Sequence, residues 1–283
     1  MDYVNLVPGA PASSRLGFGC GSVMGRVGRA PSLRAIGAAL DGGVTHFDVA
    51  RLYGYGEAEA LVGAALKGHR DRVVIASKFG LDAPRSAGAL RALKPAAQFL
   101  AGAIPGVRTV LRSLVGGARQ ADDRFSPTKA AASLDQSLAA LGTDYLDILF
   151  LHDCAAGDLS DALLAFLDAR VAAGKIRAYG VATTIDAAVP LAAVHGDRLI
   201  YQFASSRLAP NAERLAGAGL RIVAHSPFFG AERLSGGDAH RALLADALAA
   251  PGVGVVLCSM LGEAHLRANL AVAAASQARQ AAE

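Results

Sequence analysis

The stretch YLDILFLH, at residues 145–152, is apolar at most positions and ends on a histidine. Such a run is too apolar for a strand with one face in water, so it predicts a strand buried on both faces. Seven further short runs have a similar apolar or β-branched character: RLGFGCGS (15–22), VTHFDVA (44–50), RVVIASKFG (72–80), AYGVAT (178–183), LIYQFA (199–204), RIVAHSP (221–227) and VGVVLC (253–258). Strands of this kind are typical of a parallel sheet covered by helices.

The segments between these runs are rich in Ala and Leu at helical spacing, and several of them stop at a glycine, a common residue at helix C-termini. Eight strands that alternate with helices favour an α/β fold closed into a (β/α)8 TIM barrel, whose usual size is about 250 residues. The alternative is an open, doubly wound sheet that binds a dinucleotide. Its fingerprint G-x-G-x-x-G is not matched, because the glycines fall at Gly17, Gly19, Gly21 and Gly25.

Composition narrows the class of protein further. The 283 residues are 53% hydrophobic and 18% charged, and no repeat or linker divides them, so we expect a single barrel domain over residues 1–283. Three dispersed cysteines argue against a disulfide scaffold or a cysteine-rich zinc module. The N-terminus does not resemble a signal peptide and no apolar run approaches about 18 residues, which predicts a cytoplasmic protein without a membrane segment. The net charge of +4 comes mostly from scattered arginines, which does not indicate a nucleic-acid partner.

Residues 81–127 interrupt the alternation of strands and helices. This stretch is basic, helix-prone and broken by Pro84, Pro95 and Pro105. A helix lying on a membrane surface is one interpretation. We favour a large insertion between the third and fourth strands that covers one end of the barrel, and we expect it to contribute to the choice of substrate.

Polar side chains follow three of the predicted strands at the end where a barrel carries its active site. Asp48 and then Tyr53 follow the second strand, Lys78 ends the third and His152 ends the fourth. A phenol titrates near pH 10, so it exchanges protons at neutral pH only when a nearby cation stabilises the phenolate. We expect Lys78 to lower the pKa of Tyr53 in this way, Asp48 to hold Lys78 charged, and His152 to orient a substrate carbonyl or share the proton transfer.

Each of these residues also has a plain structural interpretation. Asp48 could cap a turn, Tyr53 could be a packed aromatic, Lys78 a surface amine and His152 a core histidine. The occurrence of all four at one barrel mouth favours catalysis. The segments FDVARLYGYGEAEALVGAAL, VVIASKFG, GTDYLDILFLHDC and GKIRAYGVATT resemble, in order and spacing, the signature blocks of the aldo-keto reductase superfamily. The resemblance runs from about residue 16 to residue 269 and implies a catalytic tetrad of Asp48, Tyr53, Lys78 and His152.

The resemblance also implies an extended NADP, with NAD as an option, bound across the barrel mouth without a separate dinucleotide-binding domain. Gln202 would hold the nicotinamide carboxamide, helped by Thr183, although Ala182-Thr183 replaces the usual Ser-Asn pair. The loop HSPFFG would cradle the pyrophosphate, and SMLGEAHLRANL would hold the adenosine phosphate. The residues implied to contact the cofactor are Gly19, Cys20, Thr183, Gln202, Ser226, Phe228, Gly230, Ser259, His265 and Asn269.

We therefore expect an NAD(P)-dependent oxidoreductase that acts on a small-molecule carbonyl or alcohol, as a monomer or weak homo-oligomer. A metal-dependent hydrolase barrel is a second hypothesis, because His46 and Asp48 share one strand face and His152, Asp153 and His225 lie near strand ends. No HxH or HExxH motif supports it, and we expect no metal. A barrel that senses a nucleotide without catalysis is a third hypothesis, against which the complete tetrad argues.

Overall fold

Eight parallel strands form a closed barrel in the computed structural model, which describes residues 1–25, 27–83, 123–211, 220–228 and 237–280. Around the barrel, the strands follow the order β10-β3-β4-β5-β6-β7-β8-β9. Their bounds are β3 Leu16–Gly19, β4 His46–Asp48, β5 Val74–Phe79, β6 Leu146–His152, β7 Ile176–Ala182, β8 Ile200–Ala204, β9 Arg221–His225 and β10 Val253–Cys258. The predicted TIM barrel and all eight of its strands are confirmed. The first strand ends earlier than expected, because Cys20–Ser22 form a 3-10 turn.

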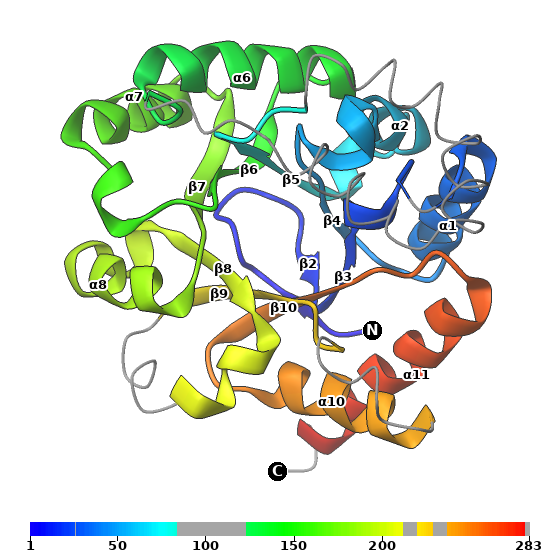
Figure 1. Cartoon of the computed structure of the whole chain (residues 1–283). Coiled ribbons are helices and arrows are strands. Elements are labelled where there is room, and N and C mark those ends of the chain that lie inside the picture. The colour runs from blue at the N-terminus through cyan, green and yellow to red at the C-terminus, as the bar shows by residue number, and fades with distance from the viewer. Residues whose placement is uncertain (26, 84–122, 212–219, 229–236, 281–283) are drawn as a thin grey trace, which may run out of the picture.

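Helices surround the barrel (Figure 1). Those described are α1 Arg29–Asp41, α2 Ala58–Ala65, α6 Pro127–Leu141, α7 Asp161–Ala172, α8 Ile185–His195, α10 Gly237–Ala249 and α11 Glu263–Gln280. Local sequence sets several of their ends. Ser126 accepts a hydrogen bond from the backbone of Lys129 at the start of α6, and Gly142 ends that helix in the left-handed conformation. No described helix is long and apolar enough to span a membrane.

The N-terminal segment forms a hairpin that the sequence did not predict. Strands β1 (Tyr3–Val4) and β2 (Ser13–Ser14) pair antiparallel, and the segment crosses the barrel opening in Figure 1. Between these strands, Leu6 and Val7 are buried and pack with residues of the barrel interior. Arg221, at the start of β9, donates to the backbone oxygen of Leu6 at 3.3 Å. The hairpin therefore closes the amino end of the barrel and leaves the carboxyl end for a ligand.

Small residues make room for large ones inside the barrel. A Cβ on Gly180 would lie 2.0 Å from the backbone oxygen of Ile200 and 2.9 Å from the Phe150 ring, and a Cβ on Gly17 would lie 2.7 Å from the Leu257 side chain. Each of these glycines thus leaves space for a bulky side chain of a neighbouring strand, so the barrel interior is a packed core and not a pore.

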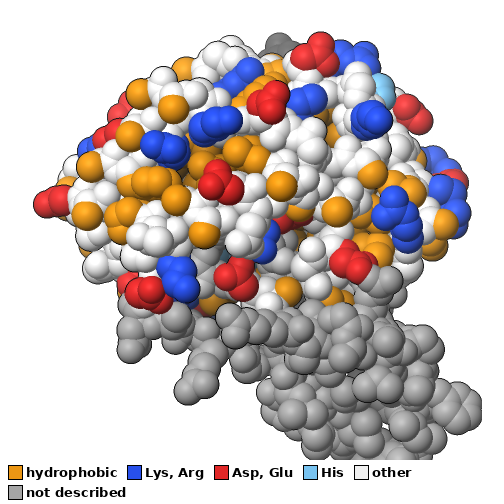
Figure 2. All heavy atoms as spheres, turned by 90° about the horizontal axis from the view of Figure 1, so that it is seen from above, with side chains coloured by type: hydrophobic (Ala, Val, Ile, Leu, Met, Phe, Trp, Pro, Cys, Tyr) orange, Lys and Arg blue, Asp and Glu red, His pale blue; other side chains and the backbone are white. Residues whose placement is uncertain are grey.

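The outer face drawn in Figure 2 mixes basic, acidic and hydrophobic side chains without a block of one sign. The predicted insertion lies largely outside the described residues.

Candidate active site

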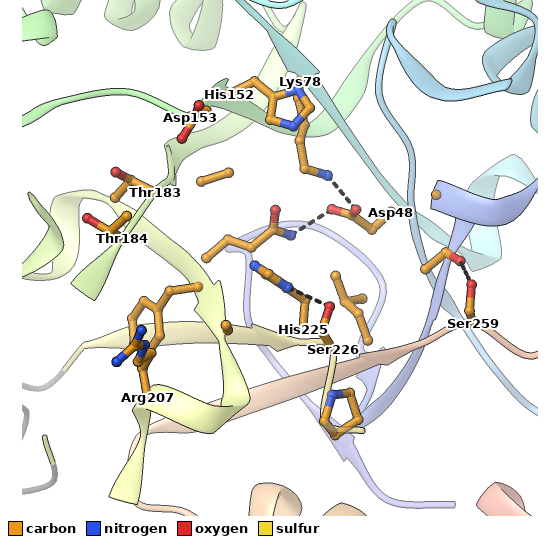
Figure 3. A pocket seen from close by; sticks show the side chains of 18 of the residues that line it. Asp48, Lys78, His152, Asp153, Thr183, Thr184, Arg207, His225, Ser226 and Ser259 are labelled. Carbon is orange, nitrogen blue, oxygen red and sulfur yellow. Dashed lines mark hydrogen bonds and ion pairs between the residues drawn. The ribbon is translucent and has the colours of Figure 1, made fainter. Parts of the chain in front are cut away.

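Four polar side chains stand at the carboxyl ends of three neighbouring strands. Asp48 is the last residue of β4, Lys78 is the second-last residue of β5, and His152 is the last residue of β6. Tyr53 begins a short 3-10 turn that follows β4. All four line one cavity of about 980 Å³ at the mouth of the barrel, which Figure 3 shows from close by. The structure therefore brings together the four residues that the sequence singled out.

Lys78 and Asp48 form a buried ion pair, with side chains that are 2% and 5% exposed. The Lys78 Nζ donates to Oδ1 of Asp48 and, at 3.2 Å, to the backbone oxygen of Val49. The second carboxylate oxygen of Asp48 accepts a hydrogen bond from Nε2 of Gln202 at 2.8 Å. Burial by itself would lower the pKa of Lys78, but the Asp48 carboxylate and Tyr53 outweigh it and the pKa is raised. Lys78 is therefore a cation at neutral pH.

The turn that carries Tyr53 depends on a glycine. Gly54 has a φ of 59°, and a Cβ there would lie 2.7 Å from the Cβ of Met24. The turn places the Tyr53 ring with its centroid 5.3 Å from Nζ of Lys78. The same ring meets His152 edge to face, with ring centroids 6.0 Å apart and an interplanar angle of 88°. Phenol, ammonium and imidazole thus share one wall of the cavity.

The surroundings raise the pKa of Tyr53 and lower the pKa of His152. Burial raises the pKa of Tyr53 above its usual value, and the nearby Lys78 offsets only part of that rise. The expectation that Lys78 brings the pKa of Tyr53 below its ordinary value is therefore wrong for this structure, because removing the phenolate from water outweighs one cation. Burial, followed by the Lys78 charge, lowers the pKa of His152 to about 4. At neutral pH the cavity holds a protonated phenol and a neutral imidazole.

Known proteins resemble this chain in both sequence and fold. The family model described as "Aldo/keto reductase family" matches residues 15–231. The chain belongs to the aldo/keto reductase family. It is 39% identical to aldo-keto reductase YhdN of Bacillus subtilis over 88 residues, which are 29% of this chain and 27% of the relative. It is 32% identical over 175 residues to D-threo-aldose 1-dehydrogenase of a Pseudomonas species, which are 60% of this chain and 48% of the relative. Alignments with the curated relatives thus span less than half the length of each.

Solved structures share the fold over nearly the whole chain. The holo form of aldo-keto reductase AKR11C1 from Bacillus halodurans matches with a TM-score of 0.68 and 21% identity, and covers 96% of this chain and 90% of its own. An aldo-keto reductase from Klebsiella pneumoniae in complex with NADPH matches with a TM-score of 0.62 and 22% identity, and covers 93% of this chain and 86% of its own. At these identities the likeness supports the fold, and the chemistry rests on the residues themselves.

In this aldo/keto reductase, six of the ten residues implied to contact a cofactor line the cavity. They are Gly19, Thr183, Gln202, Ser226, Phe228 and Ser259. Gln202 gives its amide N–H to Asp48, which leaves its amide oxygen as an acceptor. The Thr183 hydroxyl donates to the backbone oxygen of Cys154. The Ser259 hydroxyl donates to the backbone oxygen of Gly19 at 3.3 Å.

The remaining four residues lie elsewhere. Cys20 is fully buried and does not line the cavity. His265 is exposed and Asn269 is buried, and both lie on α11 outside the cavity lining. Gly230 lies outside the described residues.

The cavity also contains polar residues that the sequence analysis did not name individually as contacts of the proposed oxidoreductase. They are Ser22, Asp153, Thr184, Asp186, Arg207 and His225. Asp153 and Thr184 come one and two residues after β6 and β7, and His225 ends β9, so the rule that barrel sites lie at the carboxyl ends of strands would have found these three.

For a metal-dependent hydrolase, the structure offers little support. His46 lies at the start of β4, below Asp48, and hydrogen-bonds Ser13 at 3.1 Å. In the part of the chain that the structure describes, no three His, Cys, Asp or Glu side chains form a group that could hold a metal ion.

Proposed function

We propose that this chain is an NAD(P)-dependent oxidoreductase that interconverts a carbonyl and an alcohol. The observation that carries the proposal is the meeting of Tyr53, Lys78, Asp48 and His152 in one cavity at the barrel mouth. The bound cofactor would supply or accept the hydride. The protein would supply the proton and the charges that favour its transfer.

The proton comes from Tyr53. Because burial raises the pKa of this phenol, it is protonated at neutral pH and can donate to a carbonyl oxygen in the cavity. Donation leaves a phenolate beside the Lys78 ammonium, whose centre lies 5.3 Å from the ring centroid. The charge of Lys78 stabilises that phenolate, and Asp48 keeps Lys78 protonated. In the reverse direction the Tyr53 phenolate removes the proton of an alcohol or a sugar hemiacetal.

His152 orients the substrate oxygen. Its low pKa keeps the imidazole neutral, so it can donate one hydrogen bond without adding a second cation next to Lys78. Its edge-to-face contact with Tyr53 places both groups beside the same point in the cavity. A carbonyl oxygen held there receives the hydrogen bond of His152 and the proton of Tyr53.

The hydrogen-bonding groups around the cavity fit a nicotinamide cofactor. The amide oxygen of Gln202 can accept from a carboxamide N–H, and Ser226 and Ser259 present hydroxyl groups farther along the mouth. We propose NADP as the cofactor, because two solved aldo-keto reductase structures from Klebsiella pneumoniae that share this fold contain NADPH or NADP. NAD is the alternative, because Ser259 and His265 stand where the family commonly carries basic residues toward the 2′-phosphate. The substrate class is a small aldehyde, ketone or sugar hemiacetal. Relatives named D-threo-aldose 1-dehydrogenase, 6-dehydroglucose reductase and methylglyoxal reductase support that class.

The direct test is NADPH and NADH consumption with a panel of aldehydes, ketones and keto sugars, for the protein as it stands and for Tyr53→Phe. We expect Tyr53→Phe to lower kcat by about 10²- to 10⁴-fold, because one proton donor is lost. The Kd for NADPH, measured by calorimetry, should remain within about twofold, since the phenol is not needed to hold the cofactor.

Tyr3→Phe is the matched control, because it also removes one phenol hydroxyl, which there bonds the backbone of Gly43 at 3.0 Å in the hairpin at the opposite end of the barrel. Full activity in Tyr53→Phe would refute the role of Tyr53. The absence of NADPH and NADH consumption over the whole panel, with cofactor bound, would favour a nucleotide-sensing barrel instead.

A further inference from the structure

Arg124 and Phe125 lie between the ends of the two strands that carry Lys78 and His152. Nη2 of Arg124 donates to the backbone oxygen of Asp153 at 2.7 Å, and Nη1 donates to the backbone oxygen of His152 at 3.5 Å. The same guanidinium lies 3.6 Å from Oδ2 of Asp158 and is 14% exposed at the side chain. Arg124 thus contacts the chain directly after β6 at three points.

Phe125 fixes the other side of this pair of residues. Its ring packs edge to face on Phe79, with centroids 5.7 Å apart. It also fills the space above Gly80, where a Cβ would lie 2.4 Å from the ring. The Arg124 guanidinium stacks over the Phe125 ring at 4.4 Å. The arginine is therefore anchored to the end of β5 while it holds the end of β6.

The backbone that Arg124 holds is in an uncommon conformation. Asp153 has a φ of 55°, a left-handed conformation that a residue other than glycine adopts at a cost. Its N–H donates to the backbone oxygen of Ala182 at 2.7 Å, and its carbonyl oxygen accepts the hydrogen bond from Arg124. Asp158 accepts from the N–H of Ala155 at 2.8 Å and pairs with the same arginine. Arg124 therefore joins both ends of the turn that follows His152.

The His152 ring does not have a full set of hydrogen bonds of its own. Its Nδ1 is buried and has no hydrogen-bond partner among the described residues. The ring is held by its edge-to-face contact with Tyr53 and by the main chain to which it is attached. The position of the imidazole is therefore set largely by the backbone of His152 and Asp153.

We propose that Arg124 is a positioning residue for the reaction: it holds the backbone turn at His152 and Asp153 and so aims the imidazole at the substrate oxygen. Arg124 does not line the cavity, so it acts through His152 rather than on the substrate. The kinetic part of this proposal rests on the proposed function, whereas the placement of His152 does not.

The charge of Arg124 acts on the same imidazole. Groups that face His152 from the surrounding elements are Tyr53, Asp48, Lys78, Arg124 and His225. Burial and the positive charges of Lys78 and Arg124 lower the pKa of His152, and Asp48 raises it. Removing the Arg124 charge should therefore raise this pKa from about 4 toward its ordinary value. A side chain that served stability alone would not produce that change.

The test compares Arg124→Gln, Arg124→Lys and the matched control Arg15→Gln. Arg15 is 15% exposed, donates to the backbone oxygens of Leu248 and Val253, and lies near a carboxylate at 3.8 Å, but at the amino end of the barrel. Two readouts decide the proposal for each full-length variant, and the Kd for NADPH and the melting temperature serve as controls. The first is kcat and KM for NADPH-dependent reduction, and the second is the pKa of His152 from an NMR titration, assigned by the signal missing in His152→Asn.

Arg124→Gln should lower kcat by about 10- to 100-fold, leave the Kd for NADPH unchanged, and move the pKa of His152 upward. Arg124→Lys should restore the pKa of His152 and part of kcat, because the lysine returns the positive charge but cannot donate from two nitrogens to the two backbone oxygens. Arg15→Gln should change only the melting temperature. A His152 pKa or a kcat in Arg124→Gln equal to that in Arg15→Gln would overturn the proposal. If the parent protein reduces no carbonyl, the NMR titration alone decides the role of Arg124, while the proposed function fails separately.

Discussion

Replacing Asp48 with Asn tests the ion pair at the centre of the site. The carboxylate accepts from two donors, Nζ of Lys78 on one oxygen and Nε2 of Gln202 at 2.8 Å on the other. An amide of the same shape has one oxygen and one NH₂ group, so one of these donors would face another donor. Lys78 would remain buried, at 2% exposed, with the backbone oxygen of Val49 at 3.2 Å as a remaining acceptor.

The expected loss in free energy of unfolding is about 3–5 kcal/mol, the usual cost of removing one partner of a buried pair. That is a large share of the roughly 5–15 kcal/mol available to a folded domain. The variant should also lose about 10²-fold or more in kcat. Without Asp48, the burial that lowers the pKa of Lys78 is less opposed, so the positive charge that would stabilise the Tyr53 phenolate is held less firmly.

Asp147→Asn is the matched control. Asp147 is fully buried and pairs with Arg70 at 2.8 Å and Arg177 at 3.0 Å, but it does not line the cavity. Both arginines are partly exposed, at 20% and 29%, and can turn toward water, so about 1–3 kcal/mol should be lost with kcat unchanged. Urea unfolding followed by circular dichroism and NADPH oxidation at pH 7 provide the two measurements. Equal kcat losses in Asp48→Asn and Asp147→Asn, or a stable Asp48→Asn with full activity, would refute the reasoning.

Two further predictions concern the barrel interior. Burial lowers the pKa of His46 from 6.5 to about 4, so as the pH falls through that window the unfolded chain binds a proton that the folded chain excludes. His46 alone should then lower the free energy of unfolding by about 1.4 kcal/mol per pH unit. Urea unfolding at pH 7 and pH 5 should show a smaller loss of stability for His46→Gln than for the parent protein, and an equal loss in both would contradict this assignment. Gly180→Ala should destabilise by about 1–3 kcal/mol or more, because its Cβ would lie 2.0 Å from a backbone oxygen, whereas Gly37→Ala, with open space around it, should be neutral or stabilising in the same thermal melt.

The sequence predicted the barrel well because each strand is buried on both faces, so its apolar run is visible without neighbours. The N-terminal hairpin was missed for the opposite reason. Tyr3–Val4 and Ser13–Ser14 are two-residue strands with no periodic pattern, and Leu6 and Val7 become core residues only because an open barrel end lies next to them. The hairpin is therefore a product of the tertiary structure.

In the candidate site, too, some residues could be predicted from the sequence and others only from the tertiary structure. Asp48, Lys78 and His152 could be found from the strand ends alone, since barrel geometry brings those ends together. The hydrogen bond from Gln202 to Asp48 joins residues 154 positions apart and needs coordinates. Arg124 was missed because it precedes a helix rather than following a strand, so no rule about strand ends selects it.

The direction of the Tyr53 pKa shift explains more about the proposed chemistry than the presence of the tetrad does. A cation beside a phenol in water would favour phenolate, the form that removes a proton from an alcohol. In this cavity burial outweighs Lys78, and the resting phenol keeps its proton. In the proposed reduction the phenolate would form when a carbonyl oxygen takes that proton, and Lys78, held charged by Asp48, is already in place to stabilise it. In the proposed reaction, burial and the ion pair would act at different moments: burial would keep the proton available before reduction, and the ion pair would lower the free energy of the state that follows it.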